Sequence, residues 1–465
     1  MVVGEVSERT DVAIVGAGPG GYTAAIRCAQ AGKSVVLVER TRVGGTCLNV
    51  GCIPSKVLIH AADLASLPDR TANTGIDVST SVDAAAMKMH RREVVGGLTS
   101  GVSHLLRTAG VEVWKGTARF ARRNRLVIES DGEAPRHLEF TDAIVATGSR
   151  PIELPGLDWT NPLVTDSAGA LGLDHIPTRL AVVGAGYIGV ELGTAYAKLG
   201  SVVTLIEATD RVLPQMDVRL GRLVARRLRQ LDVDLRLSTL ALEAGDGQLT
   251  IQSGDTAEHI RTDLVVVAVG RQPNTEDLGL DVVGARLDPA GLVQVDGSRK
   301  AAPHIYAIGD ITSGPALAHK ATAEASVAAA AIAGQVVEFD PAAIPEVVFC
   351  DPELASVGHT LTSAEEAGMK TSTFRFPFAA GSRAATIDDN SGFVQLIADD
   401  AGTLIGAQLA GFGVSELVGE IAHGIEMAAT AAELADTIHP HPSMSEAVME
   451  AALGLDGRPL HVTRG

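Results

Sequence analysis

The sequence predicts an α/β protein that contains two Rossmann-like dinucleotide-binding domains. The main observation is that one plan occurs twice, at residues 12–39 and 181–207: an apolar strand, a glycine-rich turn, a helix-length stretch and a second apolar strand. The chain of 465 residues is also too long for one hydrophobic core, and its 50 glycines suit many tight strand-to-helix turns. We therefore expect three or four domains.

Four residues recur at matching places in the two repeats. Each repeat has a G-x-G-x-x-G turn and a glutamate that ends the second strand: Gly16, Gly18, Gly21 and Glu39, then Gly184, Gly186, Gly189 and Glu207. The first glycine permits a tight turn, the second lets backbone N–H groups approach a pyrophosphate, and the third lets the helix pack closely on the strand. The glutamate is expected to accept hydrogen bonds from a ribose. Each repeat therefore predicts one dinucleotide site.

The glutamates also bear on the choice of nucleotide. A carboxylate at the ribose favours a free 2′-hydroxyl and repels a 2′-phosphate, so Glu207 favours NAD over NADP in the second repeat. Arg211 lies four residues further on and offers a charge for such a phosphate, but a surface role is the simpler interpretation. We expect NAD as the nicotinamide cofactor.

Composition and charge exclude several classes of protein. The formal net charge of -18 opposes phosphate backbones, and only 3% of the residues are aromatic, so we expect no nucleic-acid binding. No apolar run approaches the length of about 18 residues that spans a membrane, and the polar start with Glu5 and Glu8 is unlike a secretory signal. We expect a cytoplasmic protein that does not bind membranes.

Two of the four cysteines form a close pair in the sequence. Cys47 and Cys52 lie near the expected start of a helix, where they can close a small ring and where the helix N-terminus stabilises a thiolate. Lys56 follows Cys52 by one helical turn, and Pro54 is expected to distort the first stretch of this helix. A zinc half-site and two buried thiols are alternatives, but no second Cys/His pair has ligand spacing, so we expect no metal.

The segment from Gly44 to Lys56 resembles the active-site motif of the dihydrolipoamide dehydrogenases, a group of FAD-dependent pyridine nucleotide-disulfide oxidoreductases. The resemblance runs along the full chain. It implies FAD in the first dinucleotide unit, NAD in the second, and a carboxy-terminal α+β dimerisation domain. It also implies that Cys47 and Cys52 form a disulfide against the flavin. In that arrangement Cys47 is the interchange thiol that meets the substrate, and Cys52 is the thiol next to the flavin.

The same resemblance suggests a partner for Lys56. It places Lys56 beside the flavin, paired with Glu191 from the second unit. The alternative is that Glu191 is an ordinary glutamate that stabilises the start of its helix. Cys28 and Cys350 have no comparable context, and we expect both to be small buried residues.

Three shorter segments resemble the flavin and linker motifs of the family. Each places a glycine at the end of a strand, and the expected cofactor-binding residues are Thr147, Gly148, Gly270 and Asp310. Asp310 is expected to accept a hydrogen bond from the ribityl chain of the flavin. Any one of these segments alone is also compatible with a plain turn.

His441 and Glu446 lie in a segment that resembles the family's carboxy-terminal His-x-His-Pro-x-x-x-Glu motif. Only a thiolate attacks a disulfide, so the reaction needs a base, and imidazole titrates near working pH. By this match His441 is the acid/base, Glu446 orients it, the bond before Pro442 is cis, and His439 is structural. In the family this histidine reaches the cysteines of the other subunit, which implies a homodimer.

The resemblance divides the chain into four segments: 1–152 binds FAD and carries the redox pair, 153–275 binds NAD, 276–343 completes the FAD site, and 344–465 forms the dimer interface. It implies oxidation of dihydrolipoamide by NAD⁺. The implied partners are lipoyl-bearing E2 or H-protein components of 2-oxoacid dehydrogenase or glycine cleavage complexes.

Other functions stay open. Among related disulfide reductases, a mercuric reductase is disfavoured because no cysteine follows Cys350, and an NADPH-linked glutathione reductase is disfavoured by Glu207. A mycothione reductase remains an alternative. The alternative from a different class is a flavin-binding redox sensor, although a sensor needs no base such as His441.

Overall fold

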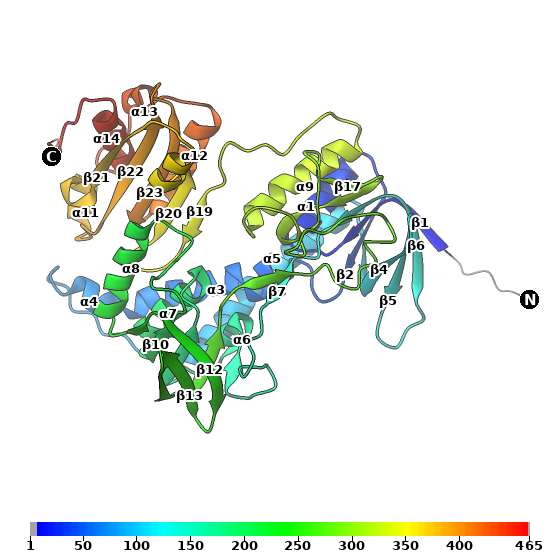
Figure 1. Ribbon diagram of the computed structural model, residues 1–465, viewed down its shortest axis with the longest axis horizontal. Coiled ribbons are helices and arrows are strands. Elements are labelled where there is room, and N and C mark those ends of the chain that lie inside the picture. Colours follow the sequence, from blue (N-terminus) through cyan, green and yellow to red (C-terminus); the bar gives the residue numbers. More distant parts are fainter. Residues whose placement is uncertain (1–6, 464–465) are drawn as a thin grey trace, which may run out of the picture.

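The structure is a computed structural model that describes residues 7–463. The limits expected at residues 1 and 465, and Glu5 of the polar start, lie outside the described part. Three lobes meet at a central junction, each built around its own sheet (Figure 1). The predicted α/β class is confirmed, and so are its two dinucleotide-type units and its carboxy-terminal α+β unit.

The first lobe contains the first repeat. Its sheet has the strand order β17-β18-β6-β1-β2-β3, in which all strands from β18 to β3 run parallel. Residues 12–15 of β1 are buried, as expected for a strand that is covered on both faces. Helices α1 and α9 pack against each other on one face (Figure 1). The bounds are β1 (Ser7–Val15), α1 (Pro19–Gln30), β2 (Val35–Glu39), β3 (Glu112–Lys115), β4 (Thr117–Arg122), β5 (Arg125–Glu129), β6 (Arg136–Val145), β17 (Lys300–Ala302), β18 (Ile305–Ala307), η1 (Gly309–Ile311) and α9 (Ala318–Ile332).

The second lobe contains the second repeat in the same arrangement. Its parallel sheet has the order β11-β10-β9-β15-β8, and an antiparallel sheet of β12, β13 and β14 lies beside it. The bounds are β8 (Val164–Thr165), α6 (Ser167–Gly172), β9 (Arg179–Val183), α7 (Tyr187–Lys198), β10 (Val202–Ile206), α8 (Val218–Gln230), β11 (Asp234–Arg236), β12 (Thr239–Gly245), β13 (Gln248–Ser253), β14 (Thr256–Arg261) and β15 (Leu264–Val267).

The third lobe is an antiparallel sheet of order β19-β20-β23-β22-β21 with helices packed against it. Buried apolar side chains form a cluster between the strands and the helices α12 and α14. The bounds are β19 (Glu346–Val348), β20 (Leu354–Gly358), α10 (Leu361–Glu366), β21 (Thr371–Pro377), η2 (Phe378–Ala380), α11 (Ser382–Thr386), β22 (Gly392–Asp399), β23 (Leu404–Gly411), α12 (Val414–Glu426), α13 (Ala431–Asp436) and α14 (Glu446–Leu455).

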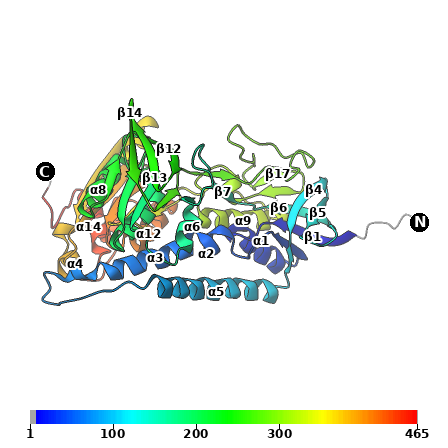
Figure 2. The same cartoon turned by 90° about the horizontal axis from the view of Figure 1, so that it is seen from below.

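The helices within residues 45–108 lie along one side of the three lobes (Figure 2). The long helix α5 lies along one side of the molecule and leaves much of its surface exposed (Figure 2). A short antiparallel pair of β7 and β16 links the first two lobes. The bounds are α2 (Gly45–Val50), α3 (Cys52–Ala65), α4 (Leu67–Thr71), α5 (Ala84–Thr108), β7 (Ser149–Pro151) and β16 (Arg271–Pro273). Within residues 7–463, no helix combines the length and the apolar character needed to cross a membrane.

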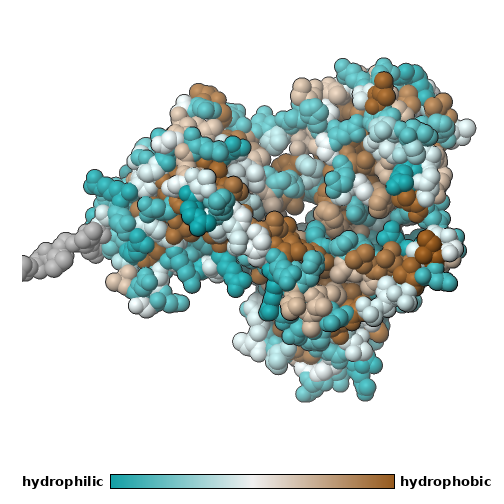
Figure 3. All heavy atoms as spheres, turned by 180° about the vertical axis from the view of Figure 1, so that it is seen from behind, coloured by the Kyte–Doolittle hydropathy of each residue, from teal (hydrophilic) through white to brown (hydrophobic). Residues whose placement is uncertain are grey.

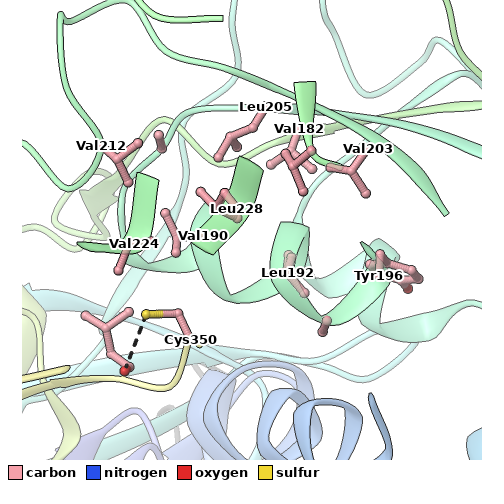
Figure 4. Close-up of a cluster of buried hydrophobic side chains, with 14 of the residues drawn as sticks. Val182, Val190, Leu192, Tyr196, Val203, Leu205, Val212, Val224, Leu228 and Cys350 are labelled. Atoms are coloured by element: carbon pink, nitrogen blue, oxygen red, sulfur yellow. Dashed lines mark hydrogen bonds between the residues drawn. The ribbon is translucent and has the colours of Figure 1, made fainter. Parts of the chain in front are cut away.

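One hydrophobic cluster joins the second and third lobes to the cysteine helix α3. It is centred on the second lobe, where α7 and α8 pack on the sheet, and it extends to Leu58 of α3 and to Cys350 and Phe393 of the third lobe. Figure 4 shows Cys350 below Val190 and Val224, with its thiol directed at the backbone oxygen of Val348. The expected burial of Cys350 and Cys28 is confirmed. The lobes are therefore held together by apolar contact around the cysteine helix.

The segment 276–343 contributes to the first lobe although it follows the second lobe in sequence. It supplies β17 and β18 to the first sheet, and α9 to the face beside α1. We propose the division at 1–152, 153–275, 276–343 and 344–465 for the domain boundaries, because each segment then keeps its sheet or its share of one intact.

The three glycines occupy equivalent positions in the two repeats. The first has a positive φ, +99° in one repeat and +102° in the other. A Cβ on the second, Gly18 or Gly186, would point into open space. A Cβ on the third would lie 1.8 Å (Gly21) or 1.9 Å (Gly189) from the carbonyl oxygen of the first glycine. The third position therefore requires glycine for packing, whereas the second leaves room at the turn for a ligand.

Replacing Gly189 with alanine is expected to destabilise the second lobe, because the new Cβ collides with the Gly184 carbonyl and the helix must move away from the strand. We expect the free energy of unfolding to fall by about 3 kcal/mol. The matched control is Gly186→Ala, which adds the same methyl group to open space. Thermal melts of the two purified variants check this, and equal midpoints would contradict the close contact.

Candidate active site

A cavity of about 550 Å³ opens where the first and second lobes meet. In the space-filling view from behind, a hollow lies at the junction of the lobes, and hydrophobic side chains gather around it (Figure 3). The cavity wall brings together most residues predicted for the flavin site, which are Gly16, Gly18, Glu39, Cys47, Cys52, Lys56, Thr147, Gly148, Glu191 and Asp310. Residues that are far apart in sequence thus share one site.

The glycines of the second repeat and two other predicted residues lie outside this cavity. They form the corresponding turn of the second lobe, at the carboxyl end of its parallel strands, where such sheets bind dinucleotides. Gly270 follows β15 at the same edge of the sheet and adopts a φ of +144°. Glu207 ends β10. The wall of the large cavity therefore does not include the turn predicted to bind NAD.

The two predicted ribose glutamates make the same contacts in both repeats. Glu39 Oε2 accepts a hydrogen bond from the backbone N–H of Ala17 at 2.7 Å, and Glu207 Oε2 accepts one from Ala185 at 2.7 Å. The other oxygen of each carboxylate accepts the N–H of the residue two places further on, at 2.7 and 2.8 Å. Arg211 is exposed and donates to the Pro214 carbonyl, as expected of a surface residue. Both glutamates therefore brace the glycine turn itself.

The cysteine pair spans two short helices. Cys47 lies in α2, and Cys52 is the first residue of α3, at the helix N-terminus. The expected distortion by Pro54 is wrong: α3 runs unbroken from Cys52, because a proline in the first turn lacks only an N–H that has no partner within the helix anyway. Both sulfurs are free thiols in this structure, so the disulfide implied by the resemblance is not formed here.

The two thiols differ in acidity. A hydrogen bond from Cys47 is the main cause that lowers the pKa of Cys52 to about 7, and the positive charge of Lys56 adds to it against the opposing effect of burial. The same hydrogen bond, together with burial, raises the pKa of Cys47. Cys52 is therefore the thiol that ionises near neutral pH.

The predicted pairing of Lys56 with Glu191 is confirmed. Lys56 Nζ lies 2.8 and 3.0 Å from the two oxygens of the Glu191 carboxylate, and 4.5 Å from the centre of the Phe349 ring. Glu191 Oε1 also accepts the backbone N–H of Phe349 at 3.0 Å. Glu191 is buried and lies beyond the first turn of α7, so the ion pair, and not the helix dipole, accounts for it.

Asp310 is held by residues that the sequence did not single out. Ser149 Oγ donates to Asp310 Oδ2 at 2.5 Å, and Arg271 Nε donates to Ser149 Oγ at 2.8 Å. Thr147 in turn donates its hydroxyl to the carbonyl of Asn274 at 2.7 Å. These contacts join the loop after β6 to the strand β16 that leaves the second lobe.

A buried charge cluster supports the loop that carries Asp310. Glu324 is fully buried; it accepts the N–H of Gly309 at 2.6 Å and forms ion pairs with Arg299 at 2.7 Å and Lys320 at 3.2 Å. Burial lowers the pKa of Lys320. The sequence did carry a sign of this cluster. Lys320 and Glu324 lie one helical turn apart in an alanine-rich helix, and such a charged pair on an apolar face indicates a buried ion pair.

His441 and Glu446 form their predicted pair in a different cavity. His441 Nδ1 lies 2.7 Å from Glu446 Oε1, and the backbone N–H of Ser443 donates to Glu446 Oε2 at 2.8 Å. The expected cis bond before Pro442 is present. His439 is buried between the Thr437 carbonyl and the Glu420 carboxylate, which confirms its structural role. The structure of one chain therefore does not bring the base to the cysteines.

Comparison with known proteins decides the family. Residues 10–325 match the pyridine nucleotide-disulphide oxidoreductase family, and residues 344–452 match the dimerisation domain of that family. The chain belongs to this family. Like other members it is an FAD-dependent oxidoreductase, with FAD and NAD as cofactors and a dimerisation domain at the carboxyl end.

Similar members of the family cover the whole chain. The dihydrolipoyl dehydrogenase of Geobacillus stearothermophilus is 43% identical over 469 residues, and that of Haloferax volcanii is 44% identical over 471 residues, each covering 99% of both chains. Among solved structures, LpdA of Mycobacterium tuberculosis superposes with a TM-score of 0.89 at 26% identity, covering 96% of this chain and 99% of that one. The HOCl-induced flavoprotein disulfide reductase RclA of Escherichia coli superposes with a TM-score of 0.84 at 29% identity, covering 95% and 99%.

The cavity residues fit an FAD molecule. The open space above Gly18 leaves the start of α1 accessible to a pyrophosphate, and Gly148 has open space in the same wall. Glu39, Cys52 and Lys56 line the same wall, which brings the glycine turn and the cysteine pair to one cavity. Within residues 7–463, no group of three or more His, Cys, Asp or Glu side chains is placed to hold a metal ion.

The variant Lys56→Met is expected to raise the pKa of Cys52 by about one unit, because the thiolate loses a neighbouring positive charge. The thiolate exists above this pKa and is lost as the pH falls through it. In the two-electron-reduced enzyme, the thiolate-to-flavin charge-transfer absorbance should therefore disappear at a higher pH than in the parent protein.

The matched variant is Glu191→Gln, which removes a negative charge that opposes the thiolate. Its charge-transfer band is expected to persist to a lower pH. A shift in the same direction in both variants would show that the charges do not control this thiol.

Proposed function

We propose that this chain is a dihydrolipoyl dehydrogenase, which catalyses dihydrolipoamide + NAD⁺ → lipoamide + NADH + H⁺. The observation that carries the proposal is the cysteine pair in the wall of the large cavity, with Lys56 and Glu191 beside it. The full-length likeness to dihydrolipoyl dehydrogenases, at 43% identity, supports the same substrate.

The proton transfers are assigned to His441. Its Nδ1 is engaged by Glu446, which leaves Nε2 on an imidazole that is 70% exposed. Nε2 takes the proton of a substrate thiol, and the resulting thiolate attacks the sulfur of Cys47 in the oxidised pair. The bond between the two cysteines breaks, and Cys52 leaves as a thiolate stabilised by Lys56.

The second substrate thiol completes the exchange. It attacks the substrate sulfur that is bonded to Cys47, which closes the lipoamide ring and releases Cys47. His441 gives the first proton to the departing Cys47 sulfur and takes the proton of the second thiol, so the reduced chain holds a Cys47 thiol, a Cys52 thiolate and one proton on His441. Bound FAD supplies the transfer of the electron pair from the dithiol to NAD⁺. The role of the chain is thus to hold Cys52 as a thiolate and to provide a base for Cys47.

We infer that the base and the cysteines of one site come from two subunits. His441 and Cys47 line different cavities of one chain, and the family's dimerisation domain carries His441. Apolar side chains are exposed on α3 and α5, including Leu64, Met89 and Leu98, and they offer a surface for the second subunit. A homodimer then contains two complete sites.

The remaining assignments belong to the same proposal. The lipoyl group arrives on a separate protein, a lipoyl-bearing E2 or H-protein of a 2-oxoacid dehydrogenase or glycine cleavage complex, in the cytoplasm. Glu207 favours NAD over NADP. Parallel assays of dihydrolipoamide with NAD⁺ and NADP⁺, and of mycothiol or glutathione disulfide with NADH and NADPH, discriminate this function from the related reductases. A faster reaction with either of those disulfides would overturn the substrate assignment.

The variant His441→Ala is expected to lose at least about 100-fold in turnover with dihydrolipoamide, because the proposed mechanism assigns the thiol proton to this imidazole. Bound FAD and the reduction of ferricyanide by NADH should remain, since neither needs this base. His423→Gln, on the exposed face of α12, serves as the control histidine. Near-normal turnover of His441→Ala would reject His441 as the base.

Hybrid dimers test the shared site. Each of the variants His441→Ala and Cys47→Ser alone should be inactive with dihydrolipoamide. When the two are unfolded and refolded together, a dimer with one chain of each kind contains one intact site. We expect recovery of about a quarter of the parent activity, because about half of the dimers are hybrids with one of two sites complete. No recovery despite proven hybrid dimers would place both residues on the same chain.

A further inference from the structure

Two ion pairs join the cysteine helix α3 to the helix α7 of the second lobe. Besides the pair of Lys56 with Glu191, Lys198 Nζ at the end of α7 lies 2.7 Å from Asp63 Oδ1 of α3. The two pairs have opposite polarity, since α3 supplies the cation of the first pair and the anion of the second. The helices lie side by side (Figure 1), and both contribute side chains to one buried apolar cluster.

The spacing of the two pairs shows how the helices are aligned. The partners are 135 residues apart in the sequence in both pairs, so the two helices run parallel and advance together. The pairs are almost two helical turns apart, or about 10.5 Å along each helix. Cys52 and Tyr187 are the first residues of α3 and α7, and each lies one turn before the first pair. The two helices therefore begin level with each other, and both first residues line the large cavity.

A short segment of the third lobe contacts both pairs. The N–H of Phe349 donates to Glu191, and Asp351 Oδ2 lies 2.8 Å from Lys198 Nζ. Arg227 Nη2 of α8 lies 2.9 Å from the same oxygen of Asp351. Burial alone would raise the pKa of Asp351, but the charges and hydrogen bonds of Lys198 and Arg227 hold it below its ordinary value. The Lys198 side chain is only 7% exposed, so one nearly buried ammonium holds carboxylates from two other parts of the chain.

This alignment bears on the chemistry because the starts of the two helices serve different sides of the reaction. Cys52 begins α3 and is proposed as the thiol next to the flavin, while the turn at residues 184–189 leads into α7 and is predicted to bind NAD. One ion pair fixes a single point of contact, whereas two pairs on the same side fix both the level and the angle of the helices. Apolar contact is not directional and adds less to such precision.

We propose that Lys198, together with Asp63 and Asp351, is a positioning residue that keeps α3 and α7 level, so that the cysteine pair and the nicotinamide meet the flavin in matched positions. All three side chains lie outside the wall of the large cavity, so their effect reaches the flavin only through the helices. This inference rests on the proposed function for the roles of Cys52 and of the second glycine turn. It does not depend on which disulfide is the substrate.

The variant Asp63→Asn removes the charge that links Lys198 to α3 and keeps the size of the side chain. Asp63 is 41% exposed, so the fold should tolerate the change. At about pH 9, where Cys52 with its pKa of about 7 is ionised, the thiolate-to-flavin charge-transfer absorbance per bound flavin should fall by at least about a third in the two-electron-reduced enzyme. Stopped-flow reduction of the flavin by NADH should be about threefold slower, because both signals depend on close alignment.

Further variants grade and control this effect. Lys198→Met breaks both links and should slow flavin reduction by about tenfold, and adding Asp63→Asn to it should cause no further loss, since the pair is already broken. Asp63→Glu keeps the carboxylate and should retain the parent signals. The matched control is Asp174→Asn, which breaks a comparable pair with Lys88 at 3.1 Å that involves neither α3 nor α7.

The outcomes separate alignment from stability. A purely structural pair would lower the melting temperature of the variants but leave the absorbance and the rate per bound flavin unchanged, which would overturn the inference. An equal loss in Asp63→Glu or in Asp174→Asn would overturn it as well. If Lys198→Met did not fold, Asp63→Asn alone would decide. If the parent protein itself formed no charge-transfer band, the proposed function would fail; a parent band that Asp63→Asn leaves intact would reject only the role of Lys198.

Discussion

One ion pair with a buried carboxylate joins the cysteine helix to the second and third lobes at the place where the redox cysteines lie. Lys56 belongs to the helix that begins with Cys52, Glu191 belongs to the second lobe, and the same carboxylate accepts the N–H of Phe349 where the third lobe begins. Glu191 is buried, so removing Lys56 would leave an uncompensated buried charge, at a cost of up to about 3–5 kcal/mol. The Glu191 carboxylate therefore adds a polar link between the second lobe and the cysteine helix to the apolar contacts around that helix.

The sequence predicts best those parts of the fold that depend on neighbouring residues and that occur in both repeats. The glycine turns and their glutamates follow from short-range backbone requirements, so both repeats form the predicted turn with the same hydrogen bonds. The cysteine pair is equally local. By contrast, the residue pattern alone did not identify a partner for Glu191. Its pair with Lys56 was predicted only through the resemblance to the family.

What the sequence did not reveal depends on contacts between distant segments. Ser149, on another strand, donates a hydrogen bond to Asp310. Glu324 accepts the N–H of Gly309 in the same loop, and it lies in an alanine-rich helix whose sequence gives no other sign of this contact. The error at Pro54 has a different origin: a helix interior excludes proline, but the first turn does not.

The bracing of the glycine turn by Glu207 has a consequence for redesign. Both oxygens of this carboxylate already accept backbone N–H groups, so a substitution that invites a 2′-phosphate would also loosen the loop that carries Gly184 and Gly186. A redesign for NADP would therefore better retain Glu207 and add cationic side chains on the surface near Arg211. The carboxylate proposed to contact the ribose is thus the group that also holds the shape of the turn.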